Sequence, residues 1–157
     1  MSGHETETEY DPPLRLQRLP SWLSARVARR AQRLVEDALA QEGARRQHFV
    51  VLTSLAEQGP ASQAALGRRL AIDRSDLHAI LNELESKGHV ARGRDATDRR
   101  RNVVALTRAG RTALARLDKR VDGAQGALLA RLSAADRRQL QRLLERVAQD
   151  EEQIARR

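Results

Sequence analysis

The sequence contains no cysteine and has only one tryptophan, one tyrosine and one phenylalanine among its 157 residues. Without cysteine the chain has no means of forming disulfide bonds, thiolate metal sites or thiol-based redox sensors. It also has no signal peptide and no apolar run approaching the roughly 18 residues that span a membrane. We therefore expect a cytoplasmic protein with no membrane partner, in which the single Trp22 is a candidate functional residue.

Motifs for catalysis and cofactor binding are missing as well. The four histidines, His4, His48, His78 and His89, are not paired at metal-ligand spacing, and there is no His-Glu-x-x-His motif. The chain has no glycine-rich phosphate loop and no Gly-x-Ser-x-Gly elbow. The sequence therefore predicts that the protein is not an enzyme and needs no cofactor or metal.

Basic residues exceed acidic ones by 29 to 21, which gives a formal net charge of +8. This balance favours a polyanionic partner, although charge alone suits RNA or a membrane surface equally well. Arginine greatly outnumbers lysine, as expected for bidentate phosphate contacts, but a GC-rich coding bias would have the same effect. The length corresponds to one domain with a real core.

The chain divides into an acidic leader and one domain. Residues 1–13 carry four acids, no Lys or Arg, and a final Pro-Pro, which predicts a flexible leader. A long helix is expected after Pro20, with Ser21 as its N-cap and Gly43 at its end. We expect residues 14–157 to form a single domain with a winged helix-turn-helix at about 45–106 and dimerisation helices at about 14–42 and 107–157.

The stretch from Ala61 to Leu106 contains the most informative pattern. A short helix to Leu70 and a tight connection precede a second helix, which Asp73 can cap and Gly88 can end. One face of this second helix is apolar by the i, i+3, i+4, i+7 rule, with Leu77, Ile80, Leu81 and Leu84. The opposite face carries small or hydrogen-bonding residues: Ser75, His78, Ala79, Asn82 and Ser86.

Such a small, polar face lets a helix seat closely in the major groove of DNA, where Asn can read adenine and Ser or His can reach base edges. An ordinary amphipathic helix with an unremarkable solvent face is the alternative.

Two strand-like runs around Val90 and Val103 follow, joined by a basic connection. Arginine in such a hairpin can enter a narrow minor groove or hold phosphates, although a solvated, charged turn would look similar. The five arginines of this region are Arg92, Arg94, Arg99, Arg100 and Arg101.

Three segments resemble the MarR family of bacterial transcriptional regulators. They are Leu84-Glu85-Ser86-Lys87-Gly88, then Asp95-Ala96-Thr97-Asp98-Arg99-Arg100-Arg101-Asn102-Val103, then Leu106-Thr107-Arg108-Ala109-Gly110. The resemblance extends over roughly residues 14–157. It implies a mainly α fold with a small β-hairpin wing, and a homodimer that binds a pseudo-palindromic operator in double-stranded DNA, usually as a repressor released by a small ligand. A sequence-tolerant architectural nucleic-acid-binding protein is the alternative function.

Taken together, the pattern and the resemblance give a set of expected DNA contacts in the two helices and the wing. They are Ser62, Gln63, Arg74, Ser75, His78, Ala79, Asn82, Arg94, Arg99, Arg100 and Arg101.

The resemblance is closest to the subgroup that responds to urate and related anions. It implies a small anionic or aromatic ligand held by Trp22 and Asp73, with Arg26 or a wing-base arginine such as Arg94 supplying charge. Trp22 and Arg26 are about one helical turn apart, and an aromatic ring beside a guanidinium suits a planar anion. The alternative is that Trp22 anchors the core or a dimer interface and Asp73 is only a helix cap.

The helices at both ends of the chain predict a partner subunit. Thr107 can cap one C-terminal helix, and Ser133 with Asp136 can open another. Their apolar faces exceed what a lone winged helix needs to cover itself, so we expect a homodimer, with packing inside one chain as the alternative. The apolar positions of the last helix are Leu140, Leu143, Leu144, Val147 and Ile154.

Overall fold

The computed structural model describes residues 12–94 and 102–154, with residues 150–154 described as backbone alone. The described part of the chain is mainly helical and contains a two-stranded antiparallel sheet, which confirms the predicted fold class. In order, the elements are α1 (Leu14–Gln17), α2 (Pro20–Ala40), α3 (Arg46–Gln58), α4 (Gln63–Leu70), α5 (Arg74–Ser86), β1 (Val90–Arg94), β2 (Asn102–Leu106), α6 (Arg108–Leu128) and α7 (Ala134–Ile154).

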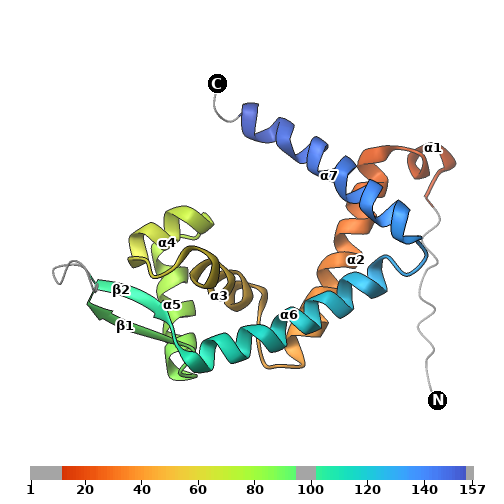
Figure 1. Ribbon diagram of the computed structural model, residues 1–157. Helices are drawn as coiled ribbons and strands as arrows, with labels where there is room; N and C mark the ends of the chain where they lie inside the picture. The colour runs from red at the N-terminus through yellow and green to blue at the C-terminus, as the bar shows by residue number, and fades with distance from the viewer. Residues whose placement is uncertain (1–11, 95–101, 155–157) are drawn as a thin grey trace, which may run out of the picture.

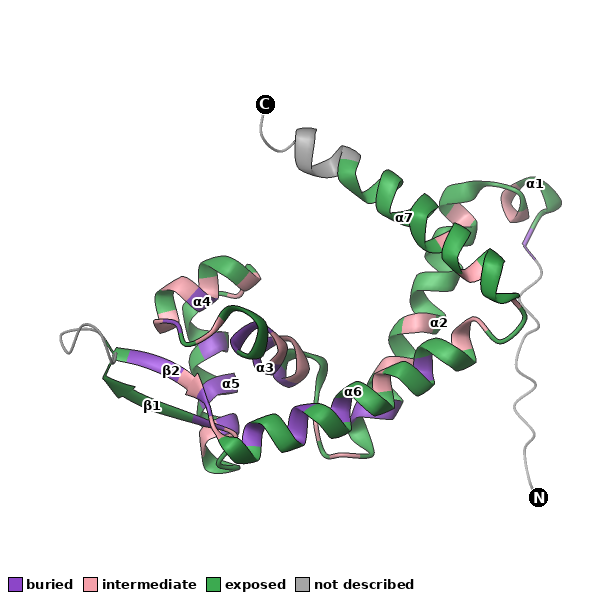
Figure 2. Ribbon diagram, in the orientation of Figure 1, coloured by how far each residue is buried: buried purple, intermediate pink, exposed green. Residues whose placement is uncertain are grey.

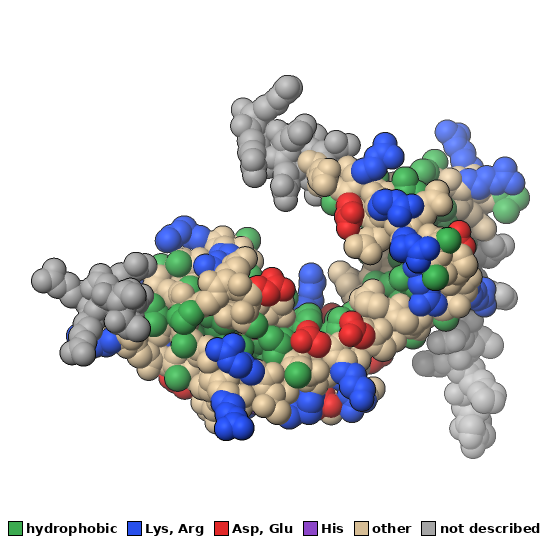
Figure 3. Space-filling view, viewed as in Figure 1, with side chains coloured by type: hydrophobic (Ala, Val, Ile, Leu, Met, Phe, Trp, Pro, Cys, Tyr) green, Lys and Arg blue, Asp and Glu red, His purple; other side chains and the backbone are tan. Residues whose placement is uncertain are grey.

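The elements form a winged part and a helical arm (Figure 1). The winged part consists of α3, α4, α5 and the β1–β2 hairpin. The arm consists of α2 and α6, which pack together, with α1 and α7 at the far end. A wide hollow separates the winged part from α7 in the space-filling view (Figure 3). No helix in the described ranges is both long and apolar enough to cross a membrane.

The core lies in the winged part and the adjoining halves of α2 and α6 (Figure 2). Leucine stripes of α3 and α5 meet there, and the predicted apolar face of α5 is no more than 5% exposed at any of its four positions. Burying a leucine side chain contributes roughly 1.5–3 kcal/mol, so these contacts stabilise the fold far more than local helix propensity does. The fully buried leucines are Leu39, Leu52, Leu66, Leu77, Leu81 and Leu84.

Several helices begin next to a residue whose side chain accepts a hydrogen bond from a free backbone N–H group of the first turn. Asp73 caps α5, Ser62 caps α4 and Thr107 caps α6, as the capping pattern predicts for Asp73 and Thr107. The Ser133 hydroxyl oxygen accepts from the Asp136 N–H at 3.2 Å at the start of α7. The predicted cap at Ser21 is wrong. Helix α2 begins at Pro20, which needs no N–H partner and whose ring presets the helical φ, so no side-chain cap is formed there.

The hairpin is attached to the rest of the winged part at its base and along β2. Val90 pairs with Leu106 and Arg94 with Asn102, and Ala61 before α4 forms an additional bridge with Val104. At the base, Gly110 of α6 lies so close to the hairpin that an added Cβ would stand 2.0 Å from the His89 carbonyl oxygen. A glycine is therefore required where α6 crosses the wing.

Candidate nucleic-acid interface

The outward face of α5 is exposed along its length, while the opposite face is buried. All five residues of the predicted polar face, Ser75, His78, Ala79, Asn82 and Ser86, are exposed. None of them has a long hydrocarbon stem, so the helix backbone can approach a flat or grooved surface closely. The arrangement offers hydroxyl, imidazole and amide groups on a rigid helix whose other side is anchored in the core.

The first turn of α5 joins α4 to form one side of this surface. A cleft is lined by residues of both helices, among them Gln63, Arg74, Ser75 and His78. The Gln63 amide donates to the Arg74 carbonyl oxygen at 3.4 Å across the helix-turn-helix. Ser62 lies just before Gln63 and caps α4. The structure thus brings together the predicted DNA contacts of the two helices.

The Asp73 carboxylate accepts hydrogen bonds from the first turn of α5. Its Oδ1 accepts from the Ser75 hydroxyl at 2.7 Å, the Ser75 N–H at 2.9 Å and the Asp76 N–H at 3.1 Å. The hydrogen bond from the Ser75 hydroxyl and those from the backbone keep the pKa of Asp73 below its usual value. The carboxylate is therefore a negatively charged cap at the positive end of the helix dipole.

The wing supplies Arg94 at the end of β1, beside a shallow groove that also contains Gln63 and Asn102. Arg94 is exposed. Three other predicted contacts, Arg99, Arg100 and Arg101, lie outside the described residues.

Arg92, which is one of the five wing arginines but not one of the expected DNA contacts, links the wing to α5. Arg92 of β1 donates from Nη2 to Oδ1 of Asn82 at 2.8 Å, and its Nη1 pairs with Glu85 Oε2. The backbone N–H of Arg92 also donates to Glu85 Oε1 at 3.3 Å. Arg92 follows Asn82 by ten positions, and only the register of the hairpin brings it back against the helix. No periodicity in the sequence marks this contact.

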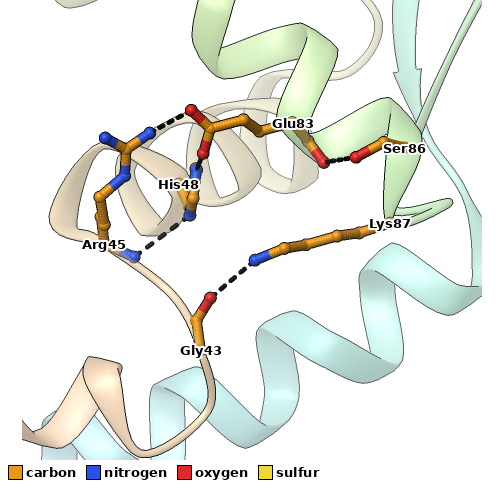
Figure 4. A network of polar contacts seen from close by, with 6 residues as sticks. All are labelled: Gly43, Arg45, His48, Glu83, Ser86 and Lys87. Atoms are coloured by element: carbon orange, nitrogen blue, oxygen red, sulfur yellow. Dashed lines mark hydrogen bonds and ion pairs between the residues drawn. The ribbon is translucent and has the colours of Figure 1, made fainter.

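A second polar network connects α3 and the loop before it with α5 (Figure 4). The buried His48 accepts from the Arg45 N–H at its Nδ1, at 3.1 Å, and lies 2.9 Å from Glu83 Oε2 through its Nε2. Glu83 Oε1 receives the guanidinium of Arg45. The Lys87 ammonium group donates to the Gly43 carbonyl oxygen at 2.6 Å. These contacts fix the orientation of α5 relative to α3.

Burial and hydrogen bonding lower the pKa values of several groups in and near this network. Burial lowers the pKa of His48, while the hydrogen bond from Arg45 lowers the pKa of Glu83. Farther along, the hydrogen bond from Arg120 lowers the pKa of Glu42, a carboxylate that also receives Arg116. Glu42 thereby ties the loop after α2 to the middle of α6.

The residues predicted to bind a small ligand do not lie together within a single chain. Trp22, which is half-buried, and Arg26 lie in the first two turns of α2, the helix that follows and contacts α1. Asp73 caps α5, which belongs to the winged part, away from the end of the arm that carries α1 (Figure 1). A single site that contains all three would have to include residues from two subunits.

Apolar side chains are exposed at the end of the arm that carries α1, α2 and α7. Leu144 is 54% exposed and Val147 is 71% exposed, in contrast to the buried stripe of α5. Solvated apolar residues at helical spacing mark a surface that another protein covers. The exposed large apolar residues are Leu14, Leu19, Leu23, Val27, Leu143, Leu144 and Val147.

A helix-turn-helix followed by a hairpin, with a polar exposed face on its second helix, defines a winged helix-turn-helix fold of the DNA-binding class. The model of the MarR family matches residues 42–101. The HTH-type transcriptional repressor Rv2887 of Mycobacterium tuberculosis is 32% identical over 116 residues, which are 74% of this chain and 84% of that repressor. The chain belongs to the MarR family of transcriptional regulators. This confirms the family resemblance, and it confirms the prediction of a regulator and not an enzyme.

A further relative and two solved structures are similar to this chain as well. A protein described as a regulator of the hcr operon of Thauera aromatica is 37% identical over 99 residues, 63% of this chain and 60% of that protein. The crystal structure of Rv2887 in complex with DNA has a TM-score of 0.69 at 30% identity, covering 87% of this chain and 98% of that one. CouR from Rhodococcus jostii RHA1 bound to p-coumaroyl-CoA has a TM-score of 0.70 at 28% identity, covering 85% and 94%.

Proposed function

We propose that the protein is a cytoplasmic, homodimeric repressor that binds a pseudo-palindromic operator in double-stranded DNA and is released by a small ligand. The observation that carries this proposal is the contrast between the two faces of α5. One face is anchored in the core, and the other presents small hydrogen-bonding groups to solvent. A helix of this kind enters the major groove, while arginines of the wing hold the backbone or the minor groove.

In this proposal the residues divide into two groups. Ser75, His78, Ala79 and Asn82 face the base edges. The positioning contacts to phosphate and sugar come from the start of the helix-turn-helix and from the wing: Ser62, Gln63, Arg74, Arg94, Arg99, Arg100 and Arg101. The net charge of +8 supports such contacts by attracting the DNA from a distance.

The dimer follows from geometry. Two recognition helices on one side of B-DNA must lie about 34 Å apart to enter successive major grooves, and one winged part does not span that distance. The exposed leucines and valines of α2 and α7 lie at the far end of the arm from the recognition helix. Pairing of two chains through this end leaves both recognition helices free.

For the ligand we propose a small anionic or aromatic compound of the kind bound by the anion-responsive subgroup, held by Trp22 and Arg26. The crystal structure of the relative CouR contains p-coumaroyl-CoA, which is both aromatic and anionic. Asp73 would join this site only across a dimer, and it would do so through Oδ2, since its capping contacts are all made by Oδ1.

DNA binding is tested by fluorescence anisotropy with the full chain and labelled duplexes. One duplex carries an inverted repeat from the DNA that flanks the gene, and the other carries the same bases shuffled. At fixed salt we expect the first to bind about 1,000-fold or more tightly. Equal affinities would instead support the alternative, a sequence-tolerant architectural protein.

Ligand binding has a direct reporter, because Trp22 is the single tryptophan of the chain. Titration with urate and with p-coumaroyl-CoA should change its fluorescence and release labelled operator. Arg26→Ala should weaken both effects. Release of DNA without any change in Trp22 fluorescence would place the ligand elsewhere.

A further inference from the structure

Arg92 is bound on both sides by groups of α5. Its guanidinium donates to Asn82 and pairs with Glu85, and its own backbone N–H donates to the same carboxylate. Its side chain is 30% exposed and that of Glu85 is 40% exposed. This makes Arg92 different from an arginine that extends freely toward a phosphate.

The contact determines which end of the Asn82 amide faces outward. A guanidinium has donors and no acceptor, so it can approach only the oxygen of the amide and never the nitrogen. Oδ1 of Asn82 therefore points to Arg92, and the amide NH₂ occupies the other side of the same planar group. Asn82 itself is exposed on the outward face of α5.

This orientation has a consequence for base recognition. Asparagine recognises adenine by accepting from N6 with its oxygen while donating to N7 with its nitrogen. A guanidinium on the oxygen takes one of its two lone pairs and places further N–H donors beside the other, so a base amino group is disfavoured there and the amide NH₂ is left to donate. Guanine offers two acceptors in the major groove, O6 and N7, and thymine offers O4. Adenine also offers N7, but beside it stands the N6 amino donor, which an oxygen already bound by a guanidinium is poorly placed to receive.

We propose that Arg92 is a positioning residue for specificity: held by Glu85, it orients the Asn82 amide so that Asn82 selects bases with acceptors and no amino donor in the major groove, guanine or thymine, in preference to adenine. This inference rests on the proposed function, since it assigns the way in which one groove-facing residue discriminates. Glu85 has a second effect in the same arrangement. It neutralises Arg92, so the pair adds little net charge to the DNA-facing surface.

The test uses the full chain and a pool of randomised duplexes, from which bound sequences are selected and counted at fixed salt. Wild type, Asn82→Ala, Arg92→Met, Arg92→Lys and the double variant Asn82→Ala/Arg92→Met are compared. Asn82→Ala identifies the operator position that Asn82 reads. Arg92→Met removes the fork, while Arg92→Lys keeps the charge and loses the planar two-sided contact.

We expect both Arg92 variants to shift the preference at that one position toward adenine by about tenfold. The shift should vanish in the Asn82→Ala background, because Arg92 acts through Asn82. Arg94→Met, two positions along β1 on the same face of the strand, is the matched control and should weaken all sequences alike.

Three outcomes would overturn the inference. Arg92→Met could lower binding to every sequence equally and reduce the salt slope, which would make Arg92 a phosphate contact. Arg92→Lys could keep the wild-type preference, which would make charge alone sufficient. The preference at the Asn82 position could stay unchanged in both variants. If instead the wild type selects no sequence at all, the proposed function fails, and that result is distinct from these three.

Discussion

His48 on α3 and Glu83 on α5 face each other at 2.9 Å between Nε2 and Oε2, and this contact couples two helices of the winged part (Figure 4). Because Nδ1 of His48 accepts from the Arg45 N–H, that nitrogen carries no proton. The imidazole is thus neutral, with its proton on Nε2 directed at the carboxylate. A second proton would have to enter at Nδ1, against a backbone N–H.

This relationship predicts a dependence of stability on pH. Burial lowers the folded-state pKa of His48 below its ordinary value near 6.5. As the pH falls, the unfolded chain therefore binds the proton first, and the stability contributed by neutral His48 is lost as the pH falls through the folded value. The free energy of unfolding should decrease below about pH 6.5 with a slope of up to about 1.4 kcal/mol per pH unit from this group.

Urea unfolding between pH 7.5 and 5 measures this slope. His48→Gln should be less stable at pH 7.5, because buried contacts change, but its stability should fall less steeply below pH 6.5. His78→Gln, the same exchange at an exposed position on α5, is the matched control for the substitution itself. An identical slope in His48→Gln would show that other groups cause the pH dependence.

Ala71, between α4 and α5, has a left-handed backbone with φ 51° and ψ 39°. Glycine tolerates this conformation without the steric cost that a Cβ brings. Ala71→Gly should raise the free energy of unfolding by about 0.5–1 kcal/mol. The same exchange at Ala79, inside α5, should lower it by about 1 kcal/mol. Destabilisation by both substitutions would mean that Ala71 is not strained.

Two glycines of α6 should respond in opposite directions to alanine. A Cβ at Gly110 would stand 2.0 Å from the His89 carbonyl oxygen and 2.8 Å from a Leu106 methyl group, whereas a Cβ at Gly123 meets nothing within 4 Å. Gly110→Ala should destabilise by about 2 kcal/mol or more, because the base of the wing has to move. Gly123→Ala should stabilise by up to about 1 kcal/mol through helix propensity. Thermal unfolding of the two variants measures the difference.

The exposed face of α7 gives a test of the dimer. Leu144→Glu places a charge in the apolar surface and should yield a monomer in sedimentation, with loss of operator binding. Gln149→Glu adds the same charge on the opposite side of the helix and should leave the oligomeric state unchanged. A dimer that persists in Leu144→Glu would exclude this face as the interface.

Arg99 and Arg100 of the wing lie outside the described residues, and we expect both to contact the DNA backbone. Arg99→Ala and Arg100→Ala should weaken binding to operator and random DNA alike, with the salt slope reduced by about one unit per lost phosphate contact. Asn82→Ala should instead affect the operator more than random DNA. Unchanged binding of the wing variants at every salt concentration would contradict a backbone role.

Local patterns made much of the fold predictable. The cap at Asp73, the leucine stripe of α5 and the left-handed Gly88 each depend on neighbours within a few residues, and all are found as expected. The contact between Arg92 and Asn82 was not predictable, since it depends on how the hairpin folds back onto the helix. The pairing of His48 with Glu83, 35 residues away, has no sequence signature either, because it depends on how α3 packs against α5.

The uninterrupted helix α6 joins the base of the wing to the end of the arm that carries the exposed apolar face. At 1.5 Å per residue, its 21 residues form a rod of about 30 Å. A tilt of about 10° at one end of such a rod displaces the other end by roughly 5 Å, which exceeds the roughly 3.4 Å rise of one base pair. Small angular changes at the far end of the arm are therefore amplified into displacements at the wing that are larger than the rise of one base pair.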